Sequence, residues 1–529
     1  MSNAKLLAVT VERFKSFETR TRVELAPLTI ILGRNNSGKS SLIQSLLLLK
    51  QTLSDARPDV MFKHEGVVEA FNLRELTYGW PAQADAVLGP SIVVEWECDV
   101  AARATLDQPR PPDLANLATL SGVPWLAQPP DRRTLRTTMC IDSVEVRGTT
   151  KVASIRLESI DAEQTTTLVV TVDDSESTCT WNGQPASKVV VEFDHFIPYL
   201  RLDRGELGGR DRQRAWHTAY LVLFAQPLQD LKRILTDLQY LGSSREPPPS
   251  LYRVKAAPNE LGVSGELAAN LLHRRERDVV HFLPLPDLLA DVPAVSNTVR
   301  ALPLVEAVND VLAALSVRAS VRVQEVQEVG FRVMFGEASI VHVGRGLGYL
   351  LPLVELGLFA DPMRFTGAVE DLSLSDYAER CGAFTQVVLE EPEAHLHPKV
   401  ASRLAHWLVS LAMSNRRVIV ETHSDHLVRR LRGLVARAGR GSALETWLLA
   451  NVVVLSVEQD EFGRSSATSS RLTAEGGVSE VWPADFMDES TEEESAIYYA
   501  KLDKTKDDSV APTGVVMVDG PEPEVDEVP

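Results

Sequence analysis

The sequence has few of the features that mark a secreted or membrane protein. Only four of its 529 residues are cysteines, and they lie far apart without a paired spacing, so we predict reduced thiols. No segment approaches the roughly 18 consecutive apolar residues that a membrane-spanning helix needs. The first five residues do not have the composition of a signal peptide. These absences together predict a cytoplasmic protein without membrane attachment.

Internal repeats and sustained heptads are also absent, which argues against a long coiled coil. The formal net charge is −19, and residues 485–529 hold fourteen acids against three lysines, a composition typical of a disordered, solvated tail. The remaining residues carry about −8, which argues against a broadly basic nucleic-acid surface. Contact with DNA stays open through local arginine groups, namely Arg201, Arg204, Arg210, Arg212 and Arg214; Arg274, Arg275 and Arg277; and Arg429, Arg430 and Arg432.

The most specific motif is GRNNSGKSS at residues 33–41, which follows an apolar strand-like stretch and opens a helical run. Its glycines let backbone amides surround a polyphosphate, and the helix N-terminus adds partial positive charge. We expect the lysine to reach the β- and γ-phosphates and the hydroxyl of Ser40 to bind Mg²⁺. The alternative is a glycine-rich turn before an ordinary helix. The predicted cofactor-binding residues are Gly33, Asn35, Asn36, Ser37, Gly38, Lys39, Ser40 and Ser41.

Two apolar strands further along the chain end in polar residues. They are residues 386–391 (QVVLEE) and residues 417–423 (RVIVETH). Acids at a strand end beside a phosphate loop can hold Mg²⁺ and orient the attacking water. We therefore predict that Glu390 binds the metal or its water shell, that Glu391 is the catalytic base, and that His423 contacts the γ-phosphate. Taken singly, each of these would more often be an acidic loop or a core histidine.

These segments resemble the ABC-type ATPases of the OLD, RecF and SMC branch. Residues 11–17 (VERFKSF), 391–398 (EPEAHLHP) and 422–424 (THS) are similar to the opening strand, the Walker B and D-loop, and the switch-histidine segment of that branch. Residues 343–352 (VGRGLGYLLP) occupy the place of its signature motif. Two further phrases are similar to prokaryotic OLD-like AAA-family ATPases of anti-phage defence systems, namely residues 240–246 (YLGSSRE) and 477–486 (GVSEVWPADF).

The resemblance implies an ATP- and Mg²⁺-dependent switch that works as a homodimer or higher oligomer, in which each signature segment caps the phosphate loop of the other subunit. It adds Gly344, Gly346 and Gly348 to the predicted cofactor-binding residues. The family usually has a serine where Gly348 stands, and a missing hydroxyl predicts weaker closure and slow basal hydrolysis. Gly348→Ser is therefore expected to tighten the dimer. The alternative is that the amides of Gly344 or Gly346 make this contact.

Some members of the branch carry a C-terminal Toprim nuclease domain, and this chain has no room for one after its last predicted strands. We therefore expect it to control a separately encoded effector, either a nuclease or a toxin. Two other functions stay open. One is a RecF-like DNA-repair ATPase that binds DNA, and the other is a nucleotide-sensing scaffold with little hydrolysis.

The fold class that we expect is α/β, an ABC-type P-loop ATPase head with an antiparallel β subdomain and a helical insertion. The head comprises residues 1–90 and 319–488. Apolar residues alternate with period two in residues 91–205, which predicts the β subdomain. Residues 206–318 read as mostly helical, with Pro227 kinking or splitting a helix. The acidic tail is residues 489–529.

Overall fold

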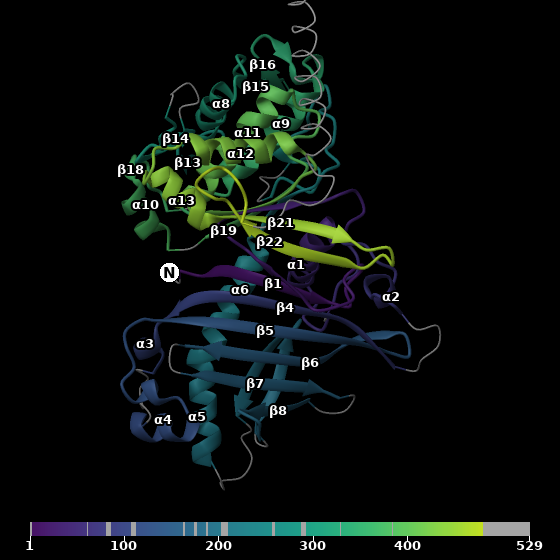
Figure 1. Cartoon of the computed structure of the whole chain (residues 1–529), viewed down its shortest axis with the longest axis vertical. Coiled ribbons are helices and arrows are strands. Elements are labelled where there is room, and N and C mark those ends of the chain that lie inside the picture. Colours follow the sequence, from purple (N-terminus) through teal and green to yellow (C-terminus); the bar gives the residue numbers. More distant parts are fainter. Residues whose placement is uncertain are drawn as a thin grey trace, which may run out of the picture. The chain divides into compact units, whose positions relative to one another are not determined.

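A six-stranded sheet carries the phosphate loop at the end of one of its strands in the computed structural model of the chain (Figure 1). Its order is β12-β19-β20-β3-β21-β22, and every neighbouring pair is parallel except β21 with β22. The inner strands β3 and β20 are buried on both faces, as expected for a parallel sheet covered by helices. The strands are β3 (Leu28–Leu32), β12 (Gln239–Leu241), β19 (Thr385–Glu390), β20 (Arg416–Glu421), β21 (Val452–Gln459) and β22 (Ser465–Arg471).

The structure describes residues 3–60, 62–80, 86–106, 113–161, 164–173, 177–186, 189–202, 210–255, 260–286, 292–327, 329–364, 366–382 and 384–479. The predicted acidic tail and most of the phrase at residues 477–486 lie outside these ranges. All described helices and strands belong to one compact unit, Met1–Trp482. None of the described helices is both long and apolar enough to cross a bilayer.

A helix follows each of three parallel strands, as the sequence predicts for the run after the phosphate loop. Helix α1 (Lys39–Leu53) follows β3, α11 (Pro398–Met413) follows β19, and α12 (Asp425–Arg437) follows β20. Helix α12 buries one apolar face, whereas α1 and the second half of α11 are buried on nearly all sides, and α11 and α12 pack against each other. The predicted α/β fold class is confirmed.

A second, antiparallel sheet of eight strands has the order β2-β1-β4-β5-β6-β7-β8-β9 (Figure 1). The long strand β4 (Ala86–Val100) pairs with β1 (Lys5–Glu12) on one side and β5 (Arg133–Val146) on the other. The boundary predicted at residue 90 therefore falls inside a strand, and the first strands of the chain share a sheet with the predicted β subdomain. The remaining strands are β2 (Thr21–Glu24), β6 (Thr149–Ile160), β7 (Thr165–Val172), β8 (Ser177–Trp181) and β9 (Gln184–Pro185), with a separate hairpin of β10 (Val189–Asp194) and β11 (Ile197–Leu202).

The helix that contains Pro227 is disturbed by a π-helical turn and is not split. Helix α5 (Arg210–Tyr220) runs through the π turn η2 (Leu221–Ala225) into α6 (Gln226–Thr236). Proline has no N–H to donate and its ring crowds the preceding turn, so a wider turn directly before it relieves the clash. The Pro227 carbonyl accepts a hydrogen bond from Nε1 of Trp96 at 3.1 Å, which ties this helix to β4.

The predicted helical insertion contains strands as well as helices. Strand β12 belongs to the central sheet, while β13 (Val279–Phe282) and β14 (Thr298–Pro303) form a small sheet with β18 (Leu372–Ser373). Strands β12, β13 and β18 have only two to four residues, too few to show a period, and the sequence analysis missed them together with β14. The other elements are α2 (Leu73–Leu76), α3 (Ala102–Leu106), α4 (Leu114–Ser121), η1 (Pro124–Ala127), α7 (Ala268–Arg275), α8 (Leu304–Ala314), β15 (Val321–Val326), β16 (Gly330–Phe335), β17 (Ala338–Ser339), η3 (Ile340–His342), α9 (Arg345–Phe359), α10 (Leu374–Cys381) and α13 (Ala443–Asn451).

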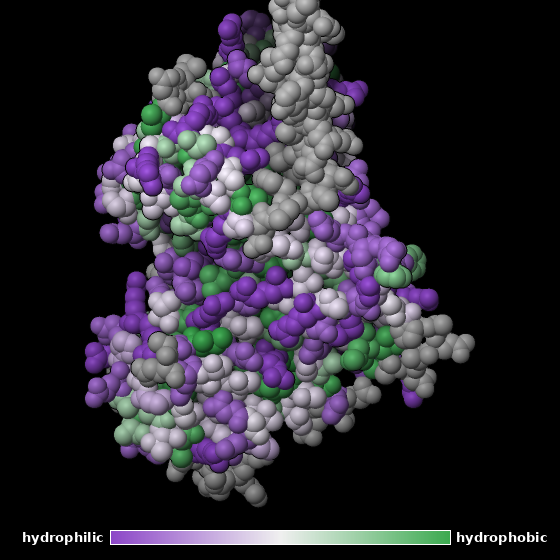
Figure 2. All heavy atoms as spheres, viewed as in Figure 1, coloured by the Kyte–Doolittle hydropathy of each residue, from purple (hydrophilic) through white to green (hydrophobic). Residues whose placement is uncertain are grey.

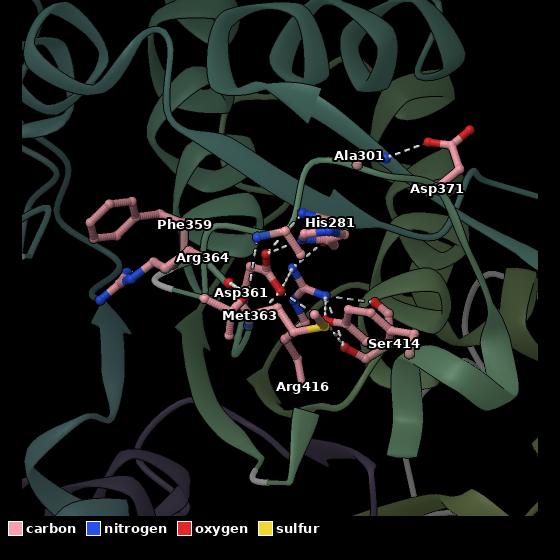
Figure 3. Close-up of polar contacts among 12 residues, drawn as sticks. His281, Ala301, Phe359, Asp361, Met363, Arg364, Asp371, Ser414 and Arg416 are labelled. Atoms are coloured by element: carbon pink, nitrogen blue, oxygen red, sulfur yellow. Dashed lines mark hydrogen bonds and ion pairs between the residues drawn. The ribbon is translucent and has the colours of Figure 1, made fainter. Parts of the chain in front are cut away.

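A buried polar network joins the start of β20 to the small sheet (Figure 3). Asp361 accepts hydrogen bonds from the His281 backbone N–H at 2.9 Å and the Tyr377 hydroxyl at 2.8 Å. Arg416 donates to the His281 carbonyl at 2.7 Å and lies 3.8 Å from the Asp361 carboxylate, and both charged side chains are fully buried. Burial alone would raise the pKa of Asp361, but His281 and Arg416 outweigh it and hold that pKa below its usual value.

We predict that Asp361→Asn lowers the free energy of unfolding by about 3–5 kcal/mol, because Arg416 then stays buried without its counter-charge. The pKa of Asp361 is depressed in the folded state. Its contribution is therefore present above the usual aspartate pKa and lost as the pH falls through the folded value. Urea unfolding should show a larger gap between wild type and variant at pH 7 than at pH 3.

The matched control is Asp371→Asn, labelled in the same view (Figure 3). Its exposed carboxylate accepts a hydrogen bond from the Ala301 N–H at 2.8 Å, so the change should cost no more than about 0.5 kcal/mol. Equal losses for the two variants would contradict the role given to Asp361.

Candidate active site

The phosphate loop lies between β3 and α1 and is closely enclosed by β21 and β22. Gly33 and Gly38 have φ values of 153° and 102°, a region that favours glycine. A Cβ at Gly33 would lie 2.2 Å from the Val457 carbonyl oxygen, and one at Gly38 would lie 2.6 Å from Oγ of Ser465. A side chain at either position would therefore displace the loop or the neighbouring strand.

Of the other predicted loop residues, two are exposed, one is buried and one is half-buried. Asn35 and Asn36 are exposed at the turn, where Asn36 has a φ of 65°. Ser37 is buried, and its carbonyl accepts a hydrogen bond from Oγ of Ser465 at 2.6 Å. Ser41 lies in the first turn of α1, half-buried.

Lys39, the first residue of α1, is folded back over the loop. It is 3% exposed, and its Nζ donates to the carbonyls of Gly33 at 3.0 Å and Arg34 at 2.7 Å. Burial lowers the pKa of Lys39, while the charges of Glu421 and Glu391 oppose the shift. From this position an ammonium group can reach a phosphate held by the loop.

Ser40 contacts an acid to which the sequence analysis gave no role. Its hydroxyl donates to Oε1 of Glu421, the last residue of β20, at 2.8 Å. Glu421 is 4% exposed, and its Oε2 has no hydrogen-bond partner among the described residues. Burial raises the pKa of Glu421 to about 7, although Ser40 and Lys39 oppose the rise. A half-satisfied carboxylate beside a serine hydroxyl offers the oxygen ligands that Mg²⁺ prefers.

Glu390 lies next to Glu421 but has a different partner. The register of β19 and β20 pairs the two residues directly. Burial raises the pKa of Glu390, while a hydrogen bond from the Tyr240 hydroxyl and one from the Ser243 backbone oppose the rise. The metal-binding role predicted for Glu390 stays a prediction, and Glu421 joins it as a candidate.

Arg245, in the loop after β12, fixes the backbone on which the acids stand. It is 8% exposed, and its Nη2 donates to the carbonyls of Glu390 at 3.3 Å and Glu391 at 2.9 Å. Its Nε and Nη1 have no partner among the described residues. Burial lowers the pKa of Arg245 to about 10, against the opposing charges of Glu393 and Glu391, so the guanidinium stays charged at neutral pH.

Glu391 and His423 lie side by side at the ends of β19 and β20. Glu391 has a φ of 42°, which is uncommon for a non-glycine residue, and its N–H donates to the Glu421 carbonyl at 2.8 Å. Nε2 of His423 lies 3.5 Å from Oε1 of Glu391, and the two side chains are 31% and 40% exposed. Burial and the charge of Lys39 lower the pKa of His423, despite the opposing charge of Glu391, so His423 is neutral at pH 7.

Glu393 is turned inwards, unlike Glu391. One of its oxygens accepts hydrogen bonds from the Thr422 hydroxyl and from the His423 N–H. Burial raises the pKa of Glu393. Of these two acids, Glu391 therefore has the more accessible carboxylate and remains the better candidate for a base.

The predicted signature segment opens helix α9 next to the Glu391–Pro398 turn. A Cβ at Gly346 would lie 2.6 Å from the His395 carbonyl oxygen. Gly344 is exposed at the N-terminus of α9, with open space where a Cβ would stand. Gly348 is buried, and a Cβ there would lie 3.1 Å from Cγ of Pro248. A serine at position 348 would thus face its own chain, so the expectation that it offers a hydroxyl to a second subunit does not fit this packing.

The structure therefore brings together the loop, Glu390, Glu391 and His423, while Gly348 is turned away. Sequence reasoning missed Glu421 and the role of Arg245. A signal for Glu421 existed, since it ends its strand as Glu390 does. Arg245 lies in the phrase at residues 240–246 that the sequence analysis singled out, but the sequence does not show that its partners are backbone carbonyls about 145 residues further along the chain.

Two segments of the chain match family models of ATPase domains. Residues 5–78 match the model described as "AAA ATPase domain". Residues 373–429 match the model described as "AAA domain, putative AbiEii toxin, Type IV TA system". The first segment contains the phosphate loop and the second contains the ends of β19 and β20, so both parts of the site have ATPase-domain sequence. No curated protein matches the chain.

Several solved structures are similar to the chain. The SmcHead bound to the C-winged helix domain of ScpA is 13% identical, with 88% of this chain and 98% of that chain covered and a TM-score of 0.35. The SMC head domain from Thermotoga maritima is 11% identical, with 88% of this chain and 98% of that chain covered and a TM-score of 0.32. A third structure is the Smc head domain with an extended coiled coil bound to the C-terminal domain of ScpA derived from Pyrococcus furiosus. It is 13% identical, with 89% of this chain and 97% of that chain covered and a TM-score of 0.36.

We predict that Arg245→Lys lowers kcat for ATP hydrolysis by about 10- to 100-fold and leaves KM for ATP nearly unchanged. Lysine keeps the charge, but its side chain is shorter, so its ammonium group does not reach the place from which Nη2 bonds both carbonyls, and the turn that carries Glu391 shifts. Phosphate release measures both constants. The control is Arg253→Lys, an exposed residue of the same segment. A raised KM with unchanged kcat would assign Arg245 to nucleotide binding instead.

Proposed function

We propose that this protein binds ATP with Mg²⁺ and hydrolyses it to ADP and phosphate. The observation that carries the proposal is the convergence, at one sheet edge, of the glycine-rich loop, the Ser40–Glu421 pair and the Glu391–His423 pair. The loop and Ser40–Glu421 supply groups that hold a magnesium polyphosphate, and Glu391 supplies a base beside it. The ATPase-domain matches at residues 5–78 and 373–429 support the same activity.

The residues present fit a magnesium ion that the nucleotide helps to hold. Mg²⁺ usually takes one or two carboxylates from a protein and completes its six ligands with phosphate oxygens and water. Oγ of Ser40 and the unpartnered Oε2 of Glu421 offer such oxygens. No group of three or more His, Cys, Asp and Glu within the described ranges is arranged to hold a metal by itself. When bound, Mg²⁺ would neutralise charge on the transferring phosphoryl group.

The side chains divide the remaining work. Lys39 exchanges the loop carbonyls of Gly33 and Arg34 for phosphate oxygens. Glu391, whose carboxylate is 40% exposed, accepts a proton from the attacking water. Neutral His423 stands 3.5 Å from Glu391, where it can hold that carboxylate in place and contact the γ-phosphate.

Two substitutions separate binding from chemistry. Lys39→Ala removes the charge that would hold the phosphates, so ATP affinity should fall by 10-fold or more. Glu391→Gln should keep ATP affinity within about threefold and lower turnover by at least 100-fold, in line with the usual contribution of a general base. Calorimetry and phosphate release measure the two effects, with exposed Glu379→Gln on α10 as the control. If Glu391→Gln hydrolyses ATP at the wild-type rate, Glu391 is not the catalytic base.

We also infer that two copies close around ATP, with the N-terminus of α9 from each copy capping the phosphate loop of the other. Gly344 and Arg345 are exposed at this helix end, where backbone N–H groups and the helix dipole attract anions. Gly344, rather than Gly348, is the glycine that faces outwards. The family resemblance supports the same arrangement.

Gly344→Asp tests this contact. Gly344 has open space around it and a φ of −56°, so aspartate fits and can cap α9, which leaves the monomer intact. Its carboxylate would repel a phosphate from the other subunit, so ATP should no longer drive dimerisation of the Glu391→Gln protein in light scattering. Gly344→Ala, without the charge, should still dimerise. Normal dimerisation of Gly344→Asp would place the contact elsewhere.

At the level of the cell, we propose an ATPase switch of a prokaryotic anti-phage system that controls a separately encoded nuclease or toxin. The phrases at residues 240–246 and 477–486 support this role. The Lys39→Ala variant, expressed with the neighbouring genes, should fail to protect cells against phage. ATP-dependent DNA binding without any protection would favour the RecF-like alternative, and ATP binding without turnover would favour a scaffold.

A further inference from the structure

A cavity of about 600 Å³ opens at the edge of the central sheet that is opposite the phosphate loop. Arg417, the second residue of β20, lines it, whereas Glu421 ends the same strand at the loop. Four residues of extended chain separate the two by roughly 13 Å. Figure 2 shows the surface hollowed between α13 and the first strands of the antiparallel sheet, at the left of the view. The cavity is therefore separate from the candidate active site.

Cations outnumber acids around this cavity. Five basic side chains line it, and three carboxylates pair with four of them. Lys5 pairs with Glu97 at 2.7 Å, Arg22 and Arg136 share Glu95, each at 2.7 Å, and Arg471 pairs with Glu24. The fifth cation, Arg417, has no carboxylate within ion-pair distance among the described residues, so the cavity keeps an excess of positive charge.

Arg417 is an under-satisfied charge in the wall of this cavity. It is 5% exposed, its Nη2 donates to the Leu25 carbonyl, and its Nε has no partner among the described residues. Burial lowers the pKa of Arg417 to about 10, against the opposing charges of Glu97 and Glu24, so the guanidinium is charged at neutral pH. A buried, charged guanidinium without an anion is costly, which favours an anionic ligand at this place.

The other lining groups add features that a nucleotide would use. The half-buried Trp447 of α13 offers an aromatic face, and Asn415 and Asn451 offer amides. A guanidinium fork matches phosphate geometry, and the volume lies within the usual range for a small-molecule site. We propose that this cavity binds a phosphate-bearing ligand of mononucleotide size, with the phosphate at Arg417 and the base on Trp447.

A nucleic-acid strand fits the cavity less well than a small ligand. Glu24 lines the cavity, and Glu95 and Glu97 pair with three of the lining cations, so these acids would repel a continuous phosphate backbone. The chain as a whole carries a net charge of −19, which opposes the electrostatic attraction on which binding to a strand depends. A single phosphate ester avoids both penalties.

The experiment uses the full chain with Lys39→Ala, which is expected to weaken nucleotide binding at the phosphate loop. AMP and adenosine are titrated calorimetrically as probes. AMP should bind with one site per chain, and adenosine, which lacks the phosphate, at least 10-fold more weakly. Adding Arg417→Met should weaken AMP binding by 10-fold or more, whereas Arg156→Met, an exposed arginine of β6, should leave it unchanged.

A second variant keeps the test decisive if Arg417→Met does not fold, as judged by circular dichroism. Trp447→Leu removes the stacking surface and should weaken AMP binding by 5-fold or more. The proposal is overturned if AMP does not bind at millimolar concentration, if adenosine binds as well as AMP, or if both variants bind AMP normally. Binding of a 5′-phosphorylated hexanucleotide in the absence of AMP binding would also overturn it.

Discussion

The parallel pairing of β3, β19 and β20 is the constraint on which the candidate site depends. Parallel strands end at the same edge of a sheet, and the register pairs Glu390 with Glu421 and Glu421 with Ile31 at the start of the phosphate loop. Two acids are thereby placed side by side at this edge, and Glu421 contacts Ser40. A slip of β20 by one residue would turn Glu421 to the other face of the sheet and remove it from Ser40. The register thus decides that Glu421 lies beside Ser40, where both side chains could bind the proposed Mg²⁺.

Strand β20 is held by polar contacts at both ends. At its start, Arg416 belongs to the buried network with Asp361, and Arg417 lines the cavity beside Leu25. These two residues serve different neighbours because successive side chains of a strand point to opposite faces. At its end, Glu421 meets Ser40. Buried charges of this kind stabilise little by themselves, but a wrong pairing would leave them unsatisfied, so they favour one register over its alternatives.

The sequence predicted the local parts of this arrangement well. The loop at residues 33–41 has the spacing of a phosphate-binding turn, and acids at residues 390 and 391 end an apolar strand. It predicted the middle of the chain less well. Strand β12 has three residues, too few to show a period, yet the loop after it carries Arg245 to the carbonyls of Glu390 and Glu391. The sequence predicted a kink or break of the helix at Pro227, but it did not predict that the helix contains a π turn before this residue.

The sequence by itself determined which reactive groups this protein carries. The glycine-rich loop, the strand-end acid pair and the strand-end histidine each lie within a short contiguous segment and can be found without the fold. Only the tertiary structure decided which acid faces Ser40, which glycine of the 344–348 segment faces outwards, and which arginine holds the turn at Glu391. These choices depend on strand register and on packing between residues far apart in the chain. Such contacts leave no periodic or local trace in a single sequence, because the partner of each side chain is fixed only when the sheet is assembled.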